Sequence, residues 1–305
     1  MSKHRLQERH KKTMEIPNNK TPIRYAGSKT RAIKHILPYF PKNLKTVIAP
    51  FMGGGSLEVA LTNMGIFVIG FDIFKPLTIF WNQLLWNNKN LVEQLKTIEP
   101  TEENYKNVKE KLIQWEYTQE MLKNWKTDFY WREHPLKLTD VEVAAYYYFN
   151  HNTSYGPGYL GWPSSIYLNE VAWGNMIKNV EKFNTKLMAI GECDYKTVLW
   201  DNYNEFLYLD PPYYMGGNDN KMHAPIYPMK NIPVHHEGFD HEKLRNLLYK
   251  HKGKFVLSYN NCETIREYYK DFKLVYPKWN YSTGDNERTG IINSKESHDI
   301  LIIKE

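Results

Sequence analysis

The stretch Thr46–Asp72, TVIAPFMGGGSLEVALTNMGIFVIGFD, decides the fold of this 305-residue chain. Two short apolar runs, Val47–Ala49 and Ile66–Phe71, flank a segment with the composition of a helix. Apolar runs that alternate with a helix are typical of a parallel sheet covered by helices on both faces. We therefore predict a strand–helix–strand unit, with Ser56 as the N-cap of the helix and Gly65 at its end.

The second half of the chain predicts further strands of the same sheet. Short apolar runs occur at 205–209, 254–258, 272–276 and 299–303, and each has a length typical of a buried strand. Asp240–Lys250 predicts an amphipathic helix, because Leu244, Leu247 and Leu248 lie on one face. The pattern as a whole predicts an α/β fold.

The region between residues 88 and 190 interrupts this rhythm. It is rich in Trp, Tyr, Asn and Lys, contains helical patterns at Leu91–Ile98 and Glu103–Ile113, and has no convincing series of parallel strands. We therefore predict a sheet domain formed by residues 21–87 and 191–305, with residues 88–190 as an inserted, mainly helical subdomain. Residues 1–20 are polar and basic, which predicts a flexible tail that is either a solvated terminus or an arm that contacts phosphates.

The composition disfavours several classes of protein. No apolar run approaches the roughly 18 residues of a membrane-spanning helix, and Met1–Leu6 lacks the apolar core of a secretory signal. Cys193 and Cys262 lie far apart, and the histidines between 223 and 241 have no tight ligand pattern, so we expect no metal site. The net charge of +6 leans mildly towards a polyanionic partner.

The turn after the first predicted strand has the composition of a cofactor-binding loop. It reads Phe51-x-Gly53-x-Gly55, and glycines there let the backbone turn sharply and approach a ligand closely. Asp72 ends the next predicted strand, where a carboxylate can accept hydrogen bonds from a ribose diol. Position 58 is Glu, so the third glycine of a dinucleotide-binding fingerprint is missing. This pattern disfavours NAD and suits a cofactor without phosphates, such as S-adenosylmethionine; the alternative is a tight turn without a ligand.

A second motif, Asp210-Pro211-Pro212-Tyr213, directly follows the apolar run at 206–209. The aspartate offers a carboxylate acceptor, the prolines remove backbone N–H donors and fix φ, and the tyrosine adds a flat face. Acceptors beside an aromatic plane suit an amino group on a flat heterocycle. The alternative is a strand that ends in a proline-stiffened turn, and a cofactor site elsewhere in the chain favours the first interpretation.

The order of Tyr25-x-Gly27-x-Lys29, the glycine turn, Asp72, a long insert and Asp210–Tyr213 resembles the Dam-type DNA adenine-N6 methyltransferases, which have the alpha-class motif order. The resemblance also covers Cys193-Asp194-Tyr195, Phe239-Asp240-His241 and Phe255–Asn260, and it spans roughly residues 22 to 304. It implies a Rossmann-like, S-adenosylmethionine-dependent methyltransferase sheet, in which residues 88–190 form the target-recognition subdomain.

The resemblance also implies where the cofactor binds. Its methionine end lies against the N-terminal motif, the glycine turn wraps it, and acidic residues bind its ribose and its adenine. One departure is Ala49, where the family often has Glu or Asp, and this puts one acidic contact in doubt. The residues that match the N-terminal motif are Tyr25, Gly27 and Lys29, and those that match the glycine turn are Phe51, Gly53 and Gly55. Asp72 matches the acid that binds the ribose, and Asp194, with the adjacent Tyr195, matches the acid that binds the adenine. The resemblance implies that Asp210 also borders the cofactor.

The same resemblance makes Asp210, Pro211, Pro212 and Tyr213 the expected catalytic residues. Asp210 and the Pro211 carbonyl would accept the two protons of the target amino group, and Tyr213 would stack on a base flipped out of the duplex. The expected reaction is direct, in-line transfer without a covalent enzyme intermediate. A cytosine-N4 enzyme uses the same logic, but its motif more commonly begins with Ser, so Asp210 favours adenine.

A polar, glycine-rich loop is expected at 150–159, directly after the aromatic run Tyr146–Phe149. Asn, Ser and Thr side chains beside aromatic rings can read base edges and fill the space left by a flipped base. Lysines and arginines upstream could meet phosphates. The alternatives are a surface loop that caps an aromatic core and ordinary solvated lysines. The expected DNA contacts are Asn150, Asn152, Ser154 and Tyr155, with Lys123, Lys126 and Arg132.

The expected activity is methylation of adenine N6 in a short sequence of double-stranded DNA. One candidate partner is a cognate restriction endonuclease that acts on the same site, and the chain is expected to be a monomer or a weak dimer. We expect a cytoplasmic protein, or one in the DNA-containing compartment of a host cell, and not a secreted one. The alternatives are an adenine methyltransferase for RNA or single strands, a catalytically silent DNA-binding protein of the same fold, and a nicotinamide-dependent oxidoreductase.

Overall fold

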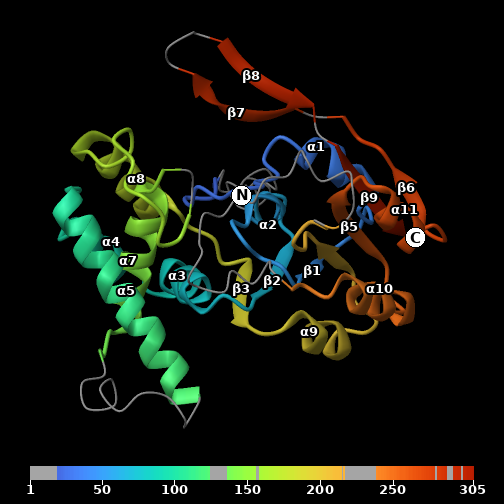
Figure 1. Ribbon diagram of the computed structural model, residues 1–305. Helices are drawn as coiled ribbons and strands as arrows, with labels where there is room; N and C mark the ends of the chain where they lie inside the picture. Colours follow the sequence, from blue (N-terminus) through green and yellow to red (C-terminus); the bar gives the residue numbers. More distant parts are fainter. Residues whose placement is uncertain are drawn as a thin grey trace, which may run out of the picture.

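The computed structural model describes residues 19–123, 136–155, 158–214, 216, 238–278, 280–286, 291–296 and 298–305. A seven-stranded sheet in the order β3-β2-β1-β4-β5-β9-β6 forms its centre (Figure 1). The first five strands run parallel, and β9 pairs antiparallel with both β5 and β6. In sheet order the strands are Met188–Glu192, Phe67–Asp72, Thr46–Ala49, Leu207–Leu209, Phe255–Asn260, Asp299–Lys304 and Lys273–Val275.

The predicted strand–helix–strand unit is confirmed, with one correction at the start of its helix. β1 pairs in parallel with β2 through Thr46↔Phe67 to Ala49↔Gly70, and helix α2 spans Ser56–Asn63 between them. The N-cap is Gly55, at φ +62°, and not Ser56. The hydroxyl of Ser56 instead accepts a hydrogen bond from the Lys29 amide at 2.9 Å. Gly65, at φ +82°, ends the helix as predicted.

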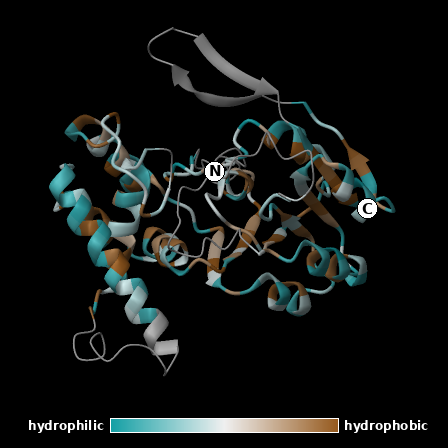
Figure 2. Cartoon of the chain, viewed as in Figure 1, coloured by the Kyte–Doolittle hydropathy of each residue, from teal (hydrophilic) through white to brown (hydrophobic). Residues whose placement is uncertain are grey.

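Each face of the sheet has its own apolar core. Along β9, Leu301 and Ile303 belong to one core and Ile300 and Ile302 to the other, because successive strand residues point to opposite faces. Figure 1 shows α9 and α10 on the side of the strands opposite α1 and α2, and Figure 2 shows the strands as an apolar centre. The helices of the first face are α1 (Ile33–Ile36), α2 and α3 (Lys75–Trp86); those of the second are α9 (Tyr195–Asp201), α10 (His241–Lys250) and α11 (Glu263–Tyr268).

The insert is mainly helical, as predicted, and its core continues into the first core of the sheet. Helix α7 is central: it packs against α3, α4 and α5, and its residues from Val143 to Thr153 are buried. Strand β3 was not predicted, and it begins at Met188, inside the range assigned to the insert. It is an edge strand with alternating burial, so its sequence lacks the continuous apolar run of the inner strands. The insert helices are α4 (Asn88–Lys96), α5 (Glu102–Lys123), α7 (Asp140–Thr153) and α8 (Glu170–Lys182).

Two further features complete the described fold. A 3₁₀ helix, Leu37–Tyr39, follows α1, and an antiparallel hairpin pairs β7 (Asn280–Asn286) with β8 (Ile291–Glu296). Within the described ranges, no helix has the length and apolar character that a bilayer span requires. Most of the predicted basic tail, residues 1–18, lies outside the described part of the chain.

Candidate active site

The predicted site residues gather at the carboxyl ends of the parallel strands. The glycine turn follows β1, Asp72 ends β2, Asp194 follows β3 and Asp210 follows β4. Because these strands are parallel, their carboxyl ends meet at the same edge. The strand order also reverses between β1 and β4, and a crevice forms at such a switch point in open α/β sheets. The topology therefore brings together motifs that are far apart in the sequence.

The glycine turn is held from several sides. The Asp72 carboxylate accepts from the Gly53 amide at 2.9 Å and from the Phe74 amide at 3.0 Å. The indole of Trp81 donates to the Gly53 carbonyl at 3.1 Å. The ring of Tyr25 lies against the turn so closely that a Cβ on Gly54 would come within 2.3 Å of the Tyr25 Cβ. The sequence did not single out Gly54 or Trp81, although both hold this turn in place.

Lys29 and Asp210 form a partly buried ion pair at the switch point. The Lys29 Nζ lies 2.7 Å from the Asp210 Oδ2 and also donates to the Gly27 carbonyl at 3.1 Å. Lys29 is 4% exposed, and the Asp210 Oδ1 is buried without a hydrogen-bond partner among the described residues. Burial raises the pKa of Asp210, and the Lys29 ammonium opposes that shift. The pair thus fixes one carboxylate oxygen and leaves the other able to accept from a ligand.

A second carboxyl lies close to this pair. Glu58, in the first turn of α2, is 3% exposed. Burial raises the pKa of Glu58 to about 8; the charge of Asp210 adds to this shift and the charge of Lys29 opposes it. Glu58 is therefore largely neutral at pH 7. The sequence marked this position only as a missing glycine.

Aromatic side chains form a wall beside Asp194. Phe51 lies 5.5 Å from the Tyr195 ring and 5.7 Å from the Phe239 ring, measured between centroids. Asp194 caps helix α9 by accepting from the Lys196 amide at 2.8 Å. An acidic group beside aromatic faces suits a flat, nitrogen-rich ring. Phe239 was not among the predicted site residues.

The segment after Asp210 is clamped by Asn260, the last residue of β5. The Asn260 Oδ1 accepts from the Tyr214 amide at 2.9 Å, and its Nδ2 donates to the Tyr214 carbonyl at 3.0 Å. Tyr213 stacks on Tyr259, with ring centroids 6.1 Å apart, and the Lys29 ammonium lies 5.1 Å from its ring centroid. Tyr213 is thus positioned by these two ring contacts and by the clamp on the residue that follows it.

The residues at this end of the strands fit an S-adenosylmethionine molecule. The Oδ1 of Asp210, which has no partner among the described residues, offers an acceptor, and the carboxylates of Asp72 and Asp194 lie at the ends of the neighbouring strands. Gly27, at φ +77°, has no atom within 4 Å of the position of a Cβ, so its surface stays open.

Comparison with known proteins identifies the family. The model of the D12 class N6 adenine-specific DNA methyltransferases matches residues 25–283 of the chain, a range that includes all the candidate site residues from Tyr25 to Tyr213. The chain belongs to this family. It is also similar to the modification methylase StsI of Streptococcus sanguinis, with 26% identity over 207 residues, which cover 64% of the chain. The match spans 28% of the length of that relative.

The D12-class chain does not present all of its expected DNA contacts to solvent. Asn150, Asn152 and Ser154 are fully buried, because 150–153 belong to helix α7 and not to a surface loop. The Oδ1 of Asn150 accepts from the Leu160 amide at 2.6 Å, and the Oγ of Ser154 accepts from the Gly158 amide at 2.9 Å. These side chains form hydrogen bonds to the backbone of the protein itself, which corrects the expectation that they face DNA.

Among the expected contacts whose side chains the structure describes, Tyr155 is the exposed one, at 75%, and Trp162 beside it is exposed at 72%. The two are joined by a hydrogen bond from the Tyr155 amide to the Trp162 carbonyl at 2.7 Å, next to the bridge between Ser154 and Pro163. Lys123 ends helix α5, and the expected phosphate contacts Lys126 and Arg132 lie outside the described residues.

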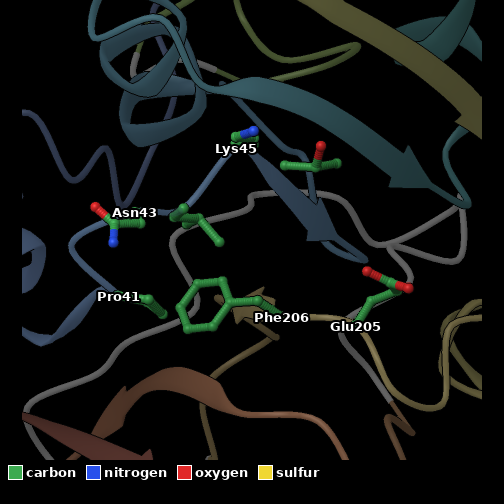
Figure 3. A pocket seen from close by; sticks show the side chains of 7 residues that line it. Pro41, Asn43, Lys45, Glu205 and Phe206 are labelled. Atoms are coloured by element: carbon green, nitrogen blue, oxygen red, sulfur yellow. The ribbon is translucent and has the colours of Figure 1, made fainter.

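A surface hollow lies at the opposite end of the strands, where β1 and β4 begin (Figure 3). Lys45, Glu205 and Phe206 are among the residues that line it. None of its lining residues belongs to a motif of the D12 class described above. The hollow is therefore separate from the candidate active site.

Proposed function

We propose that this D12-class protein transfers a methyl group from S-adenosylmethionine to N6 of adenine in a short sequence of duplex DNA. The observation that carries the proposal is the Asp210 carboxylate, with one oxygen held by Lys29 and the other buried and, among the residues that the structure describes, without a hydrogen-bond partner. A buried acceptor without a partner is costly, so such a group commonly serves a ligand.

The cofactor would lie along the carboxyl ends of β1, β2 and β3. Tyr25, Gly27 and Lys29 would border its methionine end, Asp72 its ribose, and Asp194 with Tyr195 its adenine. When bound, S-adenosylmethionine supplies an electrophilic methyl group on a positively charged sulfur. The wall of Phe51, Tyr195 and Phe239 would exclude water from the purine face.

Catalysis would consist of positioning and charge placement. The lone pair of an adenine amino group is delocalised into the ring, which makes it a poor nucleophile. Asp210 Oδ1 and the Pro211 carbonyl would accept the two amino N–H groups, and this localises the lone pair on nitrogen. Pro212 keeps the segment rigid, and Tyr213 would stack on the target base, which is worth about 1–3 kcal/mol.

The target base must leave the duplex to reach these groups. Tyr155 and Trp162, both exposed, form the aromatic surface that we assign to DNA contact. The name of the StsI relative, a modification methylase, supports a role in protecting DNA from a restriction endonuclease that acts on the same site.

The test is methyl transfer from labelled S-adenosylmethionine to genomic DNA that lacks methylated adenine, followed by single-molecule sequencing. Modified adenines in one sequence context are expected. Asp210→Ala should remove detectable turnover, while Tyr213→Phe should retain most of it, because the ring face stacks and the hydroxyl does not. Equal loss in both variants would contradict the stacking role, and no methylated adenine above background would refute the proposal.

Single-stranded DNA and RNA of the same sequences form two further arms of this experiment. Transfer to either in preference to the duplex would favour the alternative substrate class. Duplex binding without transfer to any of the three would favour a silent DNA-binding protein.

A further inference from the structure

One face of helix α7 holds the segment that precedes Lys29. Tyr148, His151 and Asn152 lie at spacings of three and four residues, so their side chains share a face. All three are buried, although they belong to the insert and not to the sheet domain.

Three hydrogen bonds join this face to Arg24. The Asn152 Oδ1 accepts from the Arg24 amide at 2.8 Å, and the Asn152 carbonyl accepts from the Arg24 Nη1 at 2.6 Å. The His151 Nε2 donates to the Arg24 carbonyl at 2.7 Å. A fourth bond, from the Tyr148 hydroxyl to the Pro22 carbonyl at 3.0 Å, extends the contact along the segment.

The protonation state of His151 follows from its surroundings. A carbonyl accepts only from a protonated nitrogen, so Nε2 carries the hydrogen. Burial lowers the pKa of His151 to about 4, and the nearby Arg24 guanidinium acts in the same direction. The ring is therefore neutral at pH 7, and its Nδ1 has no partner among the described residues.

The next residue of the segment links this junction to the cofactor site. Tyr25 stacks on His151, with ring centroids 5.6 Å apart and planes at 22°. Its other neighbours are Gly53 and Gly54 of the glycine turn. Any displacement of Tyr25 would therefore disturb the turn that borders the cofactor.

We propose that His151 and Asn152 are positioning residues for the cofactor: the end of α7 holds Arg24 and Tyr25 against the glycine turn, so these insert residues set cofactor affinity and do not read DNA. The proposal rests on the proposed function, because it takes the cofactor to be S-adenosylmethionine. It assigns to Asn152 a different role from the DNA contact that its sequence position suggested.

The test compares His151→Phe with His151→Gln in the full chain. Phe keeps a ring beside Tyr25 but lacks the donor, and Gln restores an N–H donor at a similar reach. Binding of S-adenosylmethionine and of S-adenosylhomocysteine is measured by calorimetry, and duplex DNA binding by fluorescence anisotropy. We expect the Kd of both cofactor forms to rise about tenfold in His151→Phe, as for the loss of one buried hydrogen bond, with partial recovery in His151→Gln and unchanged DNA affinity.

Two further variants distinguish a loss of cofactor affinity from a general folding defect. Arg24→Met removes the guanidinium bond to Asn152 from a less buried position and should also weaken cofactor binding. Thr153→Val is the matched control: it removes a local bond to the Phe149 carbonyl on the same helix end, and cofactor affinity should not change. In steady state, the KM for the cofactor should rise more than kcat falls.

Cofactor affinity equal to wild type in folded His151→Phe and Arg24→Met would overturn the inference, as would a loss confined to DNA binding. The same weakening in Thr153→Val would also overturn it, because the effect would then be general to the helix. If the wild-type chain bound neither cofactor form, the proposed function itself would fail, which is a distinct result.

Discussion

At the scale of single residues, the site depends on how charges are buried. Lys29 and Asp210 compensate each other at 2.7 Å, whereas Glu58 has no such close cation and is neutral at pH 7. A buried carboxyl that must stay protonated makes stability depend on pH. The protonation of Glu58 can therefore be followed through the pH dependence of the free energy of unfolding, without an activity assay.

We predict that Glu58→Gln removes part of the loss of stability at alkaline pH. The pKa of Glu58 is raised from 4.5 to about 8, so between these values the folded state binds a proton that the unfolded state has released. The free energy of unfolding then falls as pH rises, by up to about 1.4 kcal/mol per pH unit. This contribution is complete below pH 4.5 and is lost as pH passes 8.

Urea unfolding between pH 6.5 and 8 is the measurement. His151 and His241, whose pKa values are lowered by burial from 6.5 to about 4, are still partly protonated in the unfolded state near pH 6.5, but this contribution is the same in both proteins and cancels when Glu58→Gln is compared with the wild type. Their own contribution has the opposite sign and is lost as pH falls. A wild-type curve parallel to that of Glu58→Gln across the window would contradict the prediction.

At the scale of elements, the carboxyl end of each parallel strand bears one part of the site. β1 leads into the glycine turn, β2 ends at Asp72, β4 leads into Asp210–Tyr213 and β5 ends at Asn260. Because these ends share one edge, a loop after one strand can be held by a residue at the end of its neighbour. The clamp of Asn260 on Tyr214 is such a contact, between β5 and the segment that follows β4.

We predict that Asn260→Ala loosens the catalytic segment. The variant leaves the amide and the carbonyl of Tyr214 without their protein partners, at a cost of about 1–3 kcal/mol for a buried group. We expect kcat to fall more than cofactor affinity, since the methionine and ribose contacts lie on other loops. Asn261→Ala, next in the chain and bonded to Arg266, is the matched control and should retain wild-type turnover.

The measurement is kcat and the cofactor Kd for both variants, with thermal unfolding to follow stability. Equal loss of turnover in Asn260→Ala and Asn261→Ala would show that the end of β5 is generally sensitive. The specific clamp on Tyr214 would then be refuted.

At the scale of the whole molecule, exposed aromatic rings occur on both sides of the sheet. Tyr155 and Trp162 belong to the insert, whose core continues into the face covered by α2 and α3. Trp200, 77% exposed, is on α9 at the other face. The glycine turn contacts Tyr25, and Tyr25 stacks on His151 near the end of α7. Helix α7 in turn leads directly to Tyr155. This continuity is the reason that we propose DNA contact on the side of the insert.

We predict that Tyr155→Ala and Trp162→Ala each weaken duplex binding by roughly five- to 150-fold, which corresponds to the loss of about 1–3 kcal/mol of base stacking. Trp200→Ala, of similar exposure, should leave binding unchanged. Anisotropy with labelled duplex over a series of salt concentrations is the measurement. The salt dependence should stay nearly constant, because no phosphate contact is removed. A loss in Trp200→Ala equal to that in Trp162→Ala would contradict the assignment.

The sequence by itself determined the inner strands and the motif order. Continuous apolar runs such as Phe255–Leu257 have few alternatives to a buried strand, and the motifs from Tyr25 to Tyr213 resemble those of the family in order and spacing. It did not determine β3, because an edge strand buries alternate residues and its five-residue pattern is too weak to stand out. It also did not separate the polar residues of α7 from those of a loop.

Only the tertiary structure decided which polar groups face a ligand and which face the protein. Asn152 has the composition of a DNA-reading residue, but helix α7 is buried on all sides, so its amide bonds to Arg24. Asp210 and Lys29 are 181 positions apart, and the reversal of strand order between β1 and β4 brings them within 2.7 Å. Residue types and local periodicity are properties of the sequence, whereas the solvent exposure and the hydrogen-bond partners of each side chain depend on what packs around it. For that reason the motifs could be read from the sequence, while their partners required the fold.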